Sequence, residues 1–212
     1  MKKAVIGGIA AAVIIGIAVA GVSMSGQGAA GMIDTSNGSP VVGNADAPIT
    51  IVEFGDYQCH QCYNWFHNTK PGITEEYIET GMVKFVFVDM AFLGRDSLPA
   101  SVAAYCAGDQ GMYWEYHDML YTLQDPQIDS GWASRERLKA FAFDLGLDPG
   151  VFDGCLDSNK HQGRVQSNVA EAREFGVSGT PTFAIIFEDG RTETIVGAQP
   201  FSVFKNVLDS TV

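Results

Sequence analysis

The feature that most constrains this chain is a pair of cysteines, Cys59 and Cys62, separated only by His60 and Gln61. The pair directly follows the apolar run 49–54 and opens a stretch in which aromatic residues have helical spacing. A strand therefore leads into a helix at the first cysteine, where backbone N–H groups and the helix dipole favour a thiolate. Two thiols at such a turn indicate a thiol–disulfide redox site.

This placement predicts different roles for the two cysteines. We expect Cys59 to be the exposed nucleophile and Cys62, one turn into the helix, to be the more buried resolving thiol. We expect His60 to lie beside the Cys59 thiolate and, when protonated, to favour the anion. The alternatives are an ordinary stabilising disulfide for the pair and a solvent-facing side chain without a role for His60.

The N-terminal region predicts export. Residues 4–22 are all apolar or glycine, they follow Lys2 and Lys3, and the run is long enough to span a bilayer. It is longer than the apolar part of an ordinary secretory signal, which favours an uncleaved membrane anchor over cleavage after Ala20. In both cases the body of the protein lies outside the cytoplasm, where disulfides persist.

Charge and cysteine count narrow the remaining possibilities. The net charge of −12 argues against nucleic acid as a partner. Outside the cytoplasm, the even total of 4 cysteines favours a second disulfide between Cys106 and Cys155, with two buried free thiols as the alternative. A structural zinc site commonly uses two close pairs of ligands, and these two cysteines are far apart in sequence, so no metal is predicted.

The apolar periodicity predicts an alternation of strands and helices. Strands are expected over 48–55, 83–88, 182–187 and 193–196, with a hairpin turn at Asp189-Gly190 between the last two. Helices are expected over 59–81 with a break at Pro71, and over 98–107, 112–123, 134–145, 165–175 and 201–208. The first two strands should pair in parallel because a helix connects them. Residues 26–47 are rich in glycine, serine and alanine and are expected to be a flexible tether.

A second motif lies far downstream, where the segment Gly-Val-Ser-Gly-Thr-Pro-Thr at 176–182 precedes another apolar strand. Together with the Cys-x-x-Cys junction and the helical block around Cys106 and Tyr113-Trp114, this motif makes the chain resemble the thioredoxin superfamily and, within it, the DsbA-type oxidoreductases. The resemblance covers about residues 48–210. One departure is the dipeptide His60-Gln61, since the family usually has a proline there.

The resemblance implies an α/β fold of the thioredoxin type with an inserted all-helical domain. The thioredoxin part would comprise residues 48–92 and 177–212, the insertion residues 93–176, and the anchor or signal residues 1–25. Within the site, Pro181 would be a cis-proline facing the active-site disulfide, and the backbone of Thr180 would pair with an extended substrate peptide. Glu53 would be a buried acid that assists proton transfer.

The function expected from the residues and the resemblance together is an extracytoplasmic thiol–disulfide oxidoreductase that introduces disulfides into exported proteins. It would use the Cys59–Cys62 disulfide and no separate cofactor. Its partners would be reduced exported polypeptides and, by resemblance, a membrane redox protein that reoxidises it. The alternatives are a disulfide isomerase or reductase of the same fold, and a redox-inactive thioredoxin-like peptide-binding module.

Overall fold

The computed structural model describes residues 33–211, and the anchor or signal predicted over residues 1–25 lies outside them. Its centre is a four-stranded sheet with the order β2-β1-β3-β4. β1 and β2 pair in parallel, as the helical connection between them predicts, whereas the other neighbouring strands are antiparallel. The four strands are β1 (Ile49–Gly55), β2 (Val83–Asp89), β3 (Thr182–Phe187) and β4 (Thr192–Val196).

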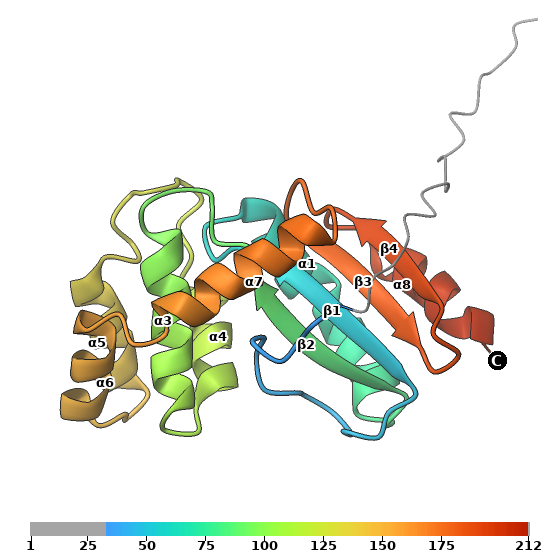
Figure 1. The fold of residues 1–212 in the computed structure, drawn as a ribbon, viewed down its shortest axis with the longest axis horizontal. Helices are drawn as coiled ribbons and strands as arrows, with labels where there is room; N and C mark the ends of the chain where they lie inside the picture. The colour runs from blue at the N-terminus through green and yellow to red at the C-terminus, as the bar shows by residue number, and fades with distance from the viewer. Residues whose placement is uncertain (1–32, 212) are drawn as a thin grey trace, which may run out of the picture.

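The two faces of the sheet belong to separate apolar cores, because successive side chains of a strand point to opposite faces. On one face, Ile51 and its neighbours pack against Trp65 of α1 (His60–Asn68) and Phe204 of α8 (Phe201–Leu208). On the other face, Val52 and its neighbours pack against Ala172 of α7 (Gln162–Glu174). In Figure 1, α7 crosses in front of the sheet, while α1 and α8 lie behind it.

The helical stretch predicted over 59–81 is broken, as Pro71 predicts, and it consists of three pieces. α1 ends at Asn68, α2 (Lys70–Ile73) follows after Thr69, and a π-helical turn, η1 (Thr74–Ile78), completes the segment. Proline lacks an N–H group and its ring clashes with the preceding turn, so the break falls just before Pro71, which occupies the first turn of α2. This break lets the chain bend back towards β2.

Four helices form a body beside the sheet, seen at the left of Figure 1. They are α3 (Ser97–Gly108), α4 (Tyr113–Thr122), α5 (Arg135–Asp144) and α6 (Pro149–Asp157). A disulfide between Cys106 of α3 and Cys155 of α6 connects two of these helices, with a sulfur–sulfur distance of 2.01 Å. Asp148 caps α6 by accepting a hydrogen bond from the N–H of Val151, and Pro149 occupies the first position of the helix.

The predicted insertion, residues 93–176, differs in one respect from the packing observed. Its last helix, α7, leaves the helical body and covers the sheet, with Val169 and Phe175 packed against the same core as Val52 and Phe54. The Phe54 and Phe175 rings stack with their centroids 5.4 Å apart. The apolar stripe of α7 has the same spacing whether it faces helices or a sheet, so the sequence alone did not assign it to the sheet.

The predicted flexible tether, residues 26–47, is corrected for the part that the structure describes. Residues 33–47 run along the outer edge of β2, where Ser39 N donates to Phe87 O at 2.8 Å and Val42 forms a bridge with Phe85. The Ser39 hydroxyl also accepts a hydrogen bond from Phe87 N. An edge strand offers unpaired N–H and C=O groups, and this segment satisfies them. We refer to residues 33–47 as the edge strap.

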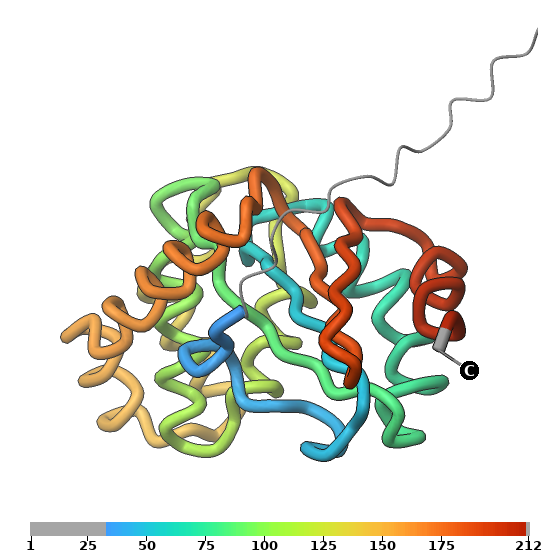
Figure 2. Tube along the Cα trace, turned by 45° about the vertical axis from the view of Figure 1, so that its right-hand side comes forward, coloured from blue at the N-terminus to red at the C-terminus, as the bar shows by residue number. Residues whose placement is uncertain are grey.

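The C-terminal part follows the prediction closely. β3 and β4 form a hairpin whose Gly190 has a φ of +83° and donates its N–H to Phe187 O, as the Asp-Gly turn requires. In Figure 2, α8 lies at the right-hand end of the molecule, and the hairpin lies between it and the centre. Within residues 33–211, no helix combines the length and apolar character needed to cross a membrane.

Candidate active site

The site lies at the end of β1, where a short turn carries the chain into α1. Cys59 is the N-cap of α1, and its N–H donates to Asp56 O at 2.9 Å. Its sulfur accepts a hydrogen bond from the N–H of Cys62, with an N–S distance of 3.4 Å. The N–H groups of a helix's first turn have no partner within the helix, so the sulfur of a cysteine at the N-cap can accept hydrogen bonds from them.

The downstream motif meets this turn in space. The peptide bond between Thr180 and Pro181 is cis, and the Cys59 thiol donates to the carbonyl oxygen of Thr180 at 3.2 Å. Gly197, the residue after β4, donates its N–H to Pro181 O at 2.8 Å, which holds the loop against the end of the hairpin. The two segments that the sequence singled out, 121 residues apart, therefore form one site.

The two thiols of the site have opposite electrostatic environments. Hydrogen bonding from the Cys62 side chain and from the N–H groups of Cys62 and Gln61 lowers the pKa of Cys59 to about 6, although burial opposes this. Burial raises the pKa of Cys62 well above its ordinary value. Both are free thiols in this structure, and Cys62 is the more buried of the two, as expected, but Cys59 is not the exposed residue that the sequence predicted, since only 7% of its surface is accessible. Near neutral pH, one thiol is therefore an anion and the other is protonated.

Glu53 lies behind the cysteines, in the middle of β1. It is paired with Phe87 of β2 and Phe183 of β3, and it shares the strand face of Ile51, which packs against α1. Burial raises the pKa of Glu53 to about 8, against an opposing effect of Lys70. Its Oε1 atom is buried and has no hydrogen-bond partner among the described residues. A carboxyl group in this state holds a proton at neutral pH.

His60 is placed differently from the expectation. Its side chain is exposed, and its ring stacks on Tyr63 with the centroids 5.7 Å apart. The hydrogen bonds at the Cys59 sulfur come instead from Cys62 and involve Thr180. Among the described contacts, His60 therefore has no direct bond to the thiol that it was expected to assist.

Several residues that support the site were not singled out in the sequence. Gln124, just after α4, donates its side-chain amide to Tyr57 O at 2.5 Å and to Cys59 O at 3.2 Å. The helical body thus holds the backbone of the active-site turn. No sequence signal could identify this residue, because Gln124 is 65 residues from Cys59 and lies in a polar loop.

Asp56 and Gln58 attach the same turn to the loops around it. The buried Asp56 carboxylate accepts hydrogen bonds from the N–H groups of Gln58, Phe92 and Leu93 and from the Ser97 hydroxyl. An aspartate that accepts from the N–H two residues later forms a turn of its own, so the Asp56-Tyr57-Gln58 order carried a signal for this role. The Gln58 side chain exchanges two hydrogen bonds with Asp129.

Buried aromatic side chains pack against the turn that precedes Cys59. The Tyr57 hydroxyl lies 2.9 Å from Nδ1 of His117, and both side chains are fully buried. Burial lowers the pKa of His117 well below its ordinary value, so its ring is neutral. Tyr121 packs against Tyr57 with the ring centroids 5.1 Å apart. The turn before Cys59 is therefore packed against buried side chains of α4.

The chain resembles known proteins in both sequence and structure. Residues 35–200 match the profile of a protein family described as Thioredoxin. Disulfide bond formation protein D from Bacillus subtilis is 30% identical over 151 residues, which are 70% of this chain and 68% of that protein.

Two solved structures give the same result. The crystal structure of oxidised BdbD from Bacillus subtilis superposes with a TM-score of 0.74 at 26% identity, and the match covers 83% of this chain and 93% of that one. Alpha-DsbA1 from Wolbachia pipientis shares the fold, with a TM-score of 0.71 at 23% identity over 80% of this chain and 88% of that one.

Proposed function

Because the chain belongs to the thioredoxin family and is a DsbA-like thiol–disulfide oxidoreductase, we propose that it acts as an oxidase that introduces disulfide bonds into exported proteins. The observation that favours oxidation of substrates over their reduction is the contrast between the two active-site thiols. A Cys59 thiolate with a pKa of about 6 stabilises the reduced enzyme, which makes the oxidised enzyme a good acceptor of electrons.

The reaction begins with the enzyme oxidised, with a bond between Cys59 and Cys62. A substrate thiolate attacks the Cys59 sulfur, a mixed disulfide forms, and Cys62 leaves as a thiolate. Cys62 then takes a proton, and Glu53, which holds one at neutral pH and is buried on the same side of the sheet, is the group proposed to supply it. The second substrate thiolate attacks the substrate sulfur of the mixed disulfide, and Cys59 leaves as the stabilised thiolate. The substrate has lost two electrons and the enzyme has gained them.

The loop around the cis peptide bond is the proposed binding site for the substrate chain. The Thr180 carbonyl lies within hydrogen-bond distance of Cys59, so a peptide that pairs with this backbone brings its own cysteine to the reactive sulfur. Pro181 has no N–H group and cannot compete for the peptide's carbonyl groups. Such pairing uses main-chain atoms, which suits an enzyme that accepts many different sequences.

The proposed setting is the outer side of a cell membrane. Residues 4–22 would anchor the chain, or a signal would be removed after Ala20, and a membrane redox protein would reoxidise the Cys59–Cys62 pair. Support comes from the apolar N-terminal run, and disulfide formation, which the name of the Bacillus subtilis relative states, is chemistry whose products persist outside the cytoplasm. These residues lie outside the described part of the chain.

The dipeptide His60-Gln61 keeps a reductase or isomerase as the second candidate, and a reduction potential separates the two functions. The reduced and oxidised protein should be equilibrated with glutathione buffers and quantified. We expect a value well above the roughly −270 mV of thioredoxin. A value near that of thioredoxin would replace the oxidase by a reductase.

The premise of the proposal is tested by titrating the reduced protein. The ultraviolet absorbance of the Cys59 thiolate should rise with a midpoint near pH 6, and the midpoint should move to about 8.5 in denaturant. In a Cys62→Ala variant, mixed disulfides with substrates should accumulate at Cys59, and a Cys59→Ser variant serves as the control that should trap none. A thiol that stays protonated into the alkaline range would remove the basis of the proposed chemistry.

A further inference from the structure

The disulfide between Cys106 and Cys155 lies beside a histidine and an aspartate, two residue types that commonly bind metal ions in proteins. The two sulfurs and a ring nitrogen of His161 all lie within 4.8 Å of one another. A carboxylate oxygen of Asp109 lies 3.6 Å from the Cys155 sulfur and 2.9 Å from Nε2 of His161. We propose that, once this disulfide is reduced, the four side chains bind one zinc ion. The disulfide and the ion would then be alternative occupants of the same place.

The donor set has the composition that zinc prefers. Structural zinc sites are tetrahedral and use cysteine thiolates, histidine nitrogens and carboxylate oxygens, and zinc is also the common metal where soft sulfur and imidazole occur together. The sulfurs must separate to roughly 3.8 Å, the spacing of two ligands with Zn–S bonds near 2.3 Å. Rotation of the two side chains can provide this change, because the Cα atoms of Cys106 and Cys155 are already 5.8 Å apart.

The fold brings these donors together from three helices. Cys106 lies on α3, Asp109 is the C-cap of that helix, Cys155 lies on α6, and His161 directly precedes α7. Sequence spacing excluded a zinc site because it showed no second close pair of cysteines. The missing ligands are a histidine and an aspartate, and they reach the two sulfurs only through the packing of the helices.

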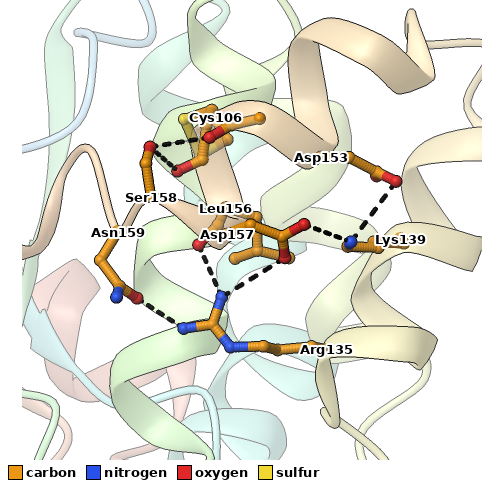
Figure 3. Close-up of polar contacts among 10 residues, drawn as sticks. Cys106, Arg135, Lys139, Asp153, Leu156, Asp157, Ser158 and Asn159 are labelled. Carbon is orange, nitrogen blue, oxygen red and sulfur yellow. Dashed lines mark hydrogen bonds and ion pairs between the residues drawn. A yellow bond between two sulfur atoms is a disulfide. The ribbon is translucent and has the colours of Figure 1, made fainter.

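Helix α6 is held in place by contacts that do not depend on the disulfide, as Figure 3 shows. Arg135 of α5 donates to Leu156 O at 2.6 Å and to Oδ1 of Asn159 at 2.5 Å. Lys139, one turn further along α5, pairs with Asp157 at 2.7 Å and with Asp153 at 3.4 Å. Reduction therefore leaves Cys155 opposite Cys106, so the two thiols stay close enough for a single ion.

The charges around the cluster also suit a bound cation. Two thiolates and the Asp109 carboxylate carry three negative charges, and zinc leaves one of them uncompensated. Lys160 lies 2.8 Å from the same Asp109 oxygen and can neutralise that charge. Its side chain is 56% exposed, so it can also move aside to admit the ion. The cysteines themselves are buried, which protects thiolate–metal bonds from competing water.

The chemistry requires an external two-electron reductant of the dithiol class. The reductant transfers two electrons and two protons to the Cys106–Cys155 bond, and its own two thiols become a disulfide. Zinc then binds the two thiols and displaces both protons. Bound zinc should slow reoxidation of the pair, because the sulfur lone pairs are occupied by the metal.

The test uses the full-length protein with Cys59→Ser and Cys62→Ser, so that only one cysteine pair remains. The protein is reduced anaerobically with a phosphine, freed of the phosphine, and titrated with Co²⁺ as a coloured substitute for zinc. We expect one cobalt ion per chain, with a thiolate-to-cobalt charge-transfer band and the intense visible bands of tetrahedral coordination. The same protein with its disulfide intact should give neither band. Binding of equal strength in the oxidised form would overturn the proposal.

Ligand variants on the same background test the two non-sulfur donors. His161→Gln and Asp109→Asn should each weaken cobalt binding by about tenfold or more. His67→Gln, which replaces an exposed histidine of α1, is the matched control and should leave the affinity unchanged. A cobalt band that is absent, or that is unaffected by both ligand variants, would contradict the four-ligand site.

A second measurement avoids the risk that a variant fails to fold. The unmodified full-length protein is reduced and treated with an alkylating reagent, with and without Zn²⁺, and the labelled peptides are quantified by mass spectrometry. Zinc should slow the labelling of both Cys106 and Cys155 by about tenfold or more, and a chelator should reverse this. Equal labelling with and without zinc would overturn the proposal independently of any substitution.

Discussion

The two cysteine pairs of this protein contain the same atoms and behave in opposite ways. Cys59 and Cys62 are close in sequence, lie at a helix N-terminus, and are free thiols with pKa values shifted in opposite directions. Cys106 and Cys155 are 49 residues apart, lie inside a helical body, and are joined. The first pair is the one proposed to exchange electrons, whereas the second connects two helices.

The difference shows that position decides the chemistry of a thiol in this fold. At Cys59, N–H groups and a neighbouring thiol stabilise one charge, and the peptide loop of Thr180 and Pro181 faces the sulfur. Cys106 and Cys155 are buried, Asp109 and His161 lie beside their sulfurs, and no peptide loop approaches the sulfurs among the described contacts. The predictions below test this contrast.

The largest expected effect is on activity. Cys59→Ser should lower the rate of oxidative refolding of a reduced substrate by roughly 10³-fold or more, because it removes the sulfur that forms the mixed disulfide. The matched variant Cys106→Ala/Cys155→Ala should retain most of the activity under conditions where it stays folded. If both variants lose activity to the same extent, the separation between a reactive pair and a structural pair is wrong.

The next effect is on stability and should have the reverse pattern. Cys106→Ala/Cys155→Ala should lower the free energy of unfolding by about 4 kcal/mol in the chain-entropy account, because the disulfide closes a long loop. The midpoint of urea unfolding measures this. As the control, Cys59→Ala/Cys62→Ala removes a pair that closes only a short loop and should cost much less. Equal losses in the two variants would contradict the structural role.

Glu53→Gln tests the charge behind the reactive pair. The ordinary pKa of 4.5 is raised to about 8, so the folded protein binds more protons than the unfolded one between these values. Stability should therefore fall as pH rises from 4.5 to 8, and Glu53→Gln should remove this decline. At pH 7 the variant should be more stable by about 3 kcal/mol.

The control for this prediction is the exposed Glu79→Gln, which should leave the pH dependence unchanged. The same Glu53→Gln variant should resolve mixed disulfides more slowly, by roughly tenfold or more, if the carboxyl group supplies the proton to Cys62. A variant with an unaltered stability profile between pH 5 and 8 would show that Glu53 is ionised throughout.

Gln124→Ala tests the contact between the helical body and the active-site turn. Loss of the amide that bonds Tyr57 O and Cys59 O should destabilise the protein by about 1–3 kcal/mol and raise the pKa of Cys59, because the turn that aims N–H groups at the sulfur is loosened. Urea unfolding and thiolate absorbance measure the two effects. The exposed Gln127→Ala should change neither value. If the pKa of Cys59 in Gln124→Ala equals that of the unmodified protein, Gln124 has a structural role only.

The smallest effect is expected at His60. The side chain is exposed and stacked on Tyr63, so its influence on the thiolate is screened by water. His60→Ala should raise the pKa of Cys59 by less than about one unit. His67→Ala, on the same helix, is the control. A shift of several units in His60→Ala would restore the direct role that the sequence predicted.

The parts of the fold that follow from local sequence were predicted well. Strand β1, the break before Pro71 and the Asp189-Gly190 hairpin each depend on residues within a few positions of one another. Cys59 as a helix N-cap is of the same kind, since a strand, a turn and an aromatic helical stretch are consecutive in the chain.

The remaining parts depend on tertiary contacts, which a single sequence does not encode in any local pattern. Gln124 reaches the active-site turn from a distant polar loop. The edge strap has the composition of a linker and is ordered by the unpaired edge of β2. His117 is buried against Tyr57, which lies 60 residues earlier in the chain. In each case the partner lies too far along the chain to be identified from spacing.

The edge strap also sets where the chain can be shortened. A fragment that begins at Pro48 would leave the backbone amides and carbonyls of Phe85 and Phe87 without partners along a solvent-facing strand. Such a strand recruits another copy of itself, so this fragment should self-associate. A fragment that begins at Ile33 keeps the edge strap paired with the outer edge of β2 and should remain monomeric at the same concentration.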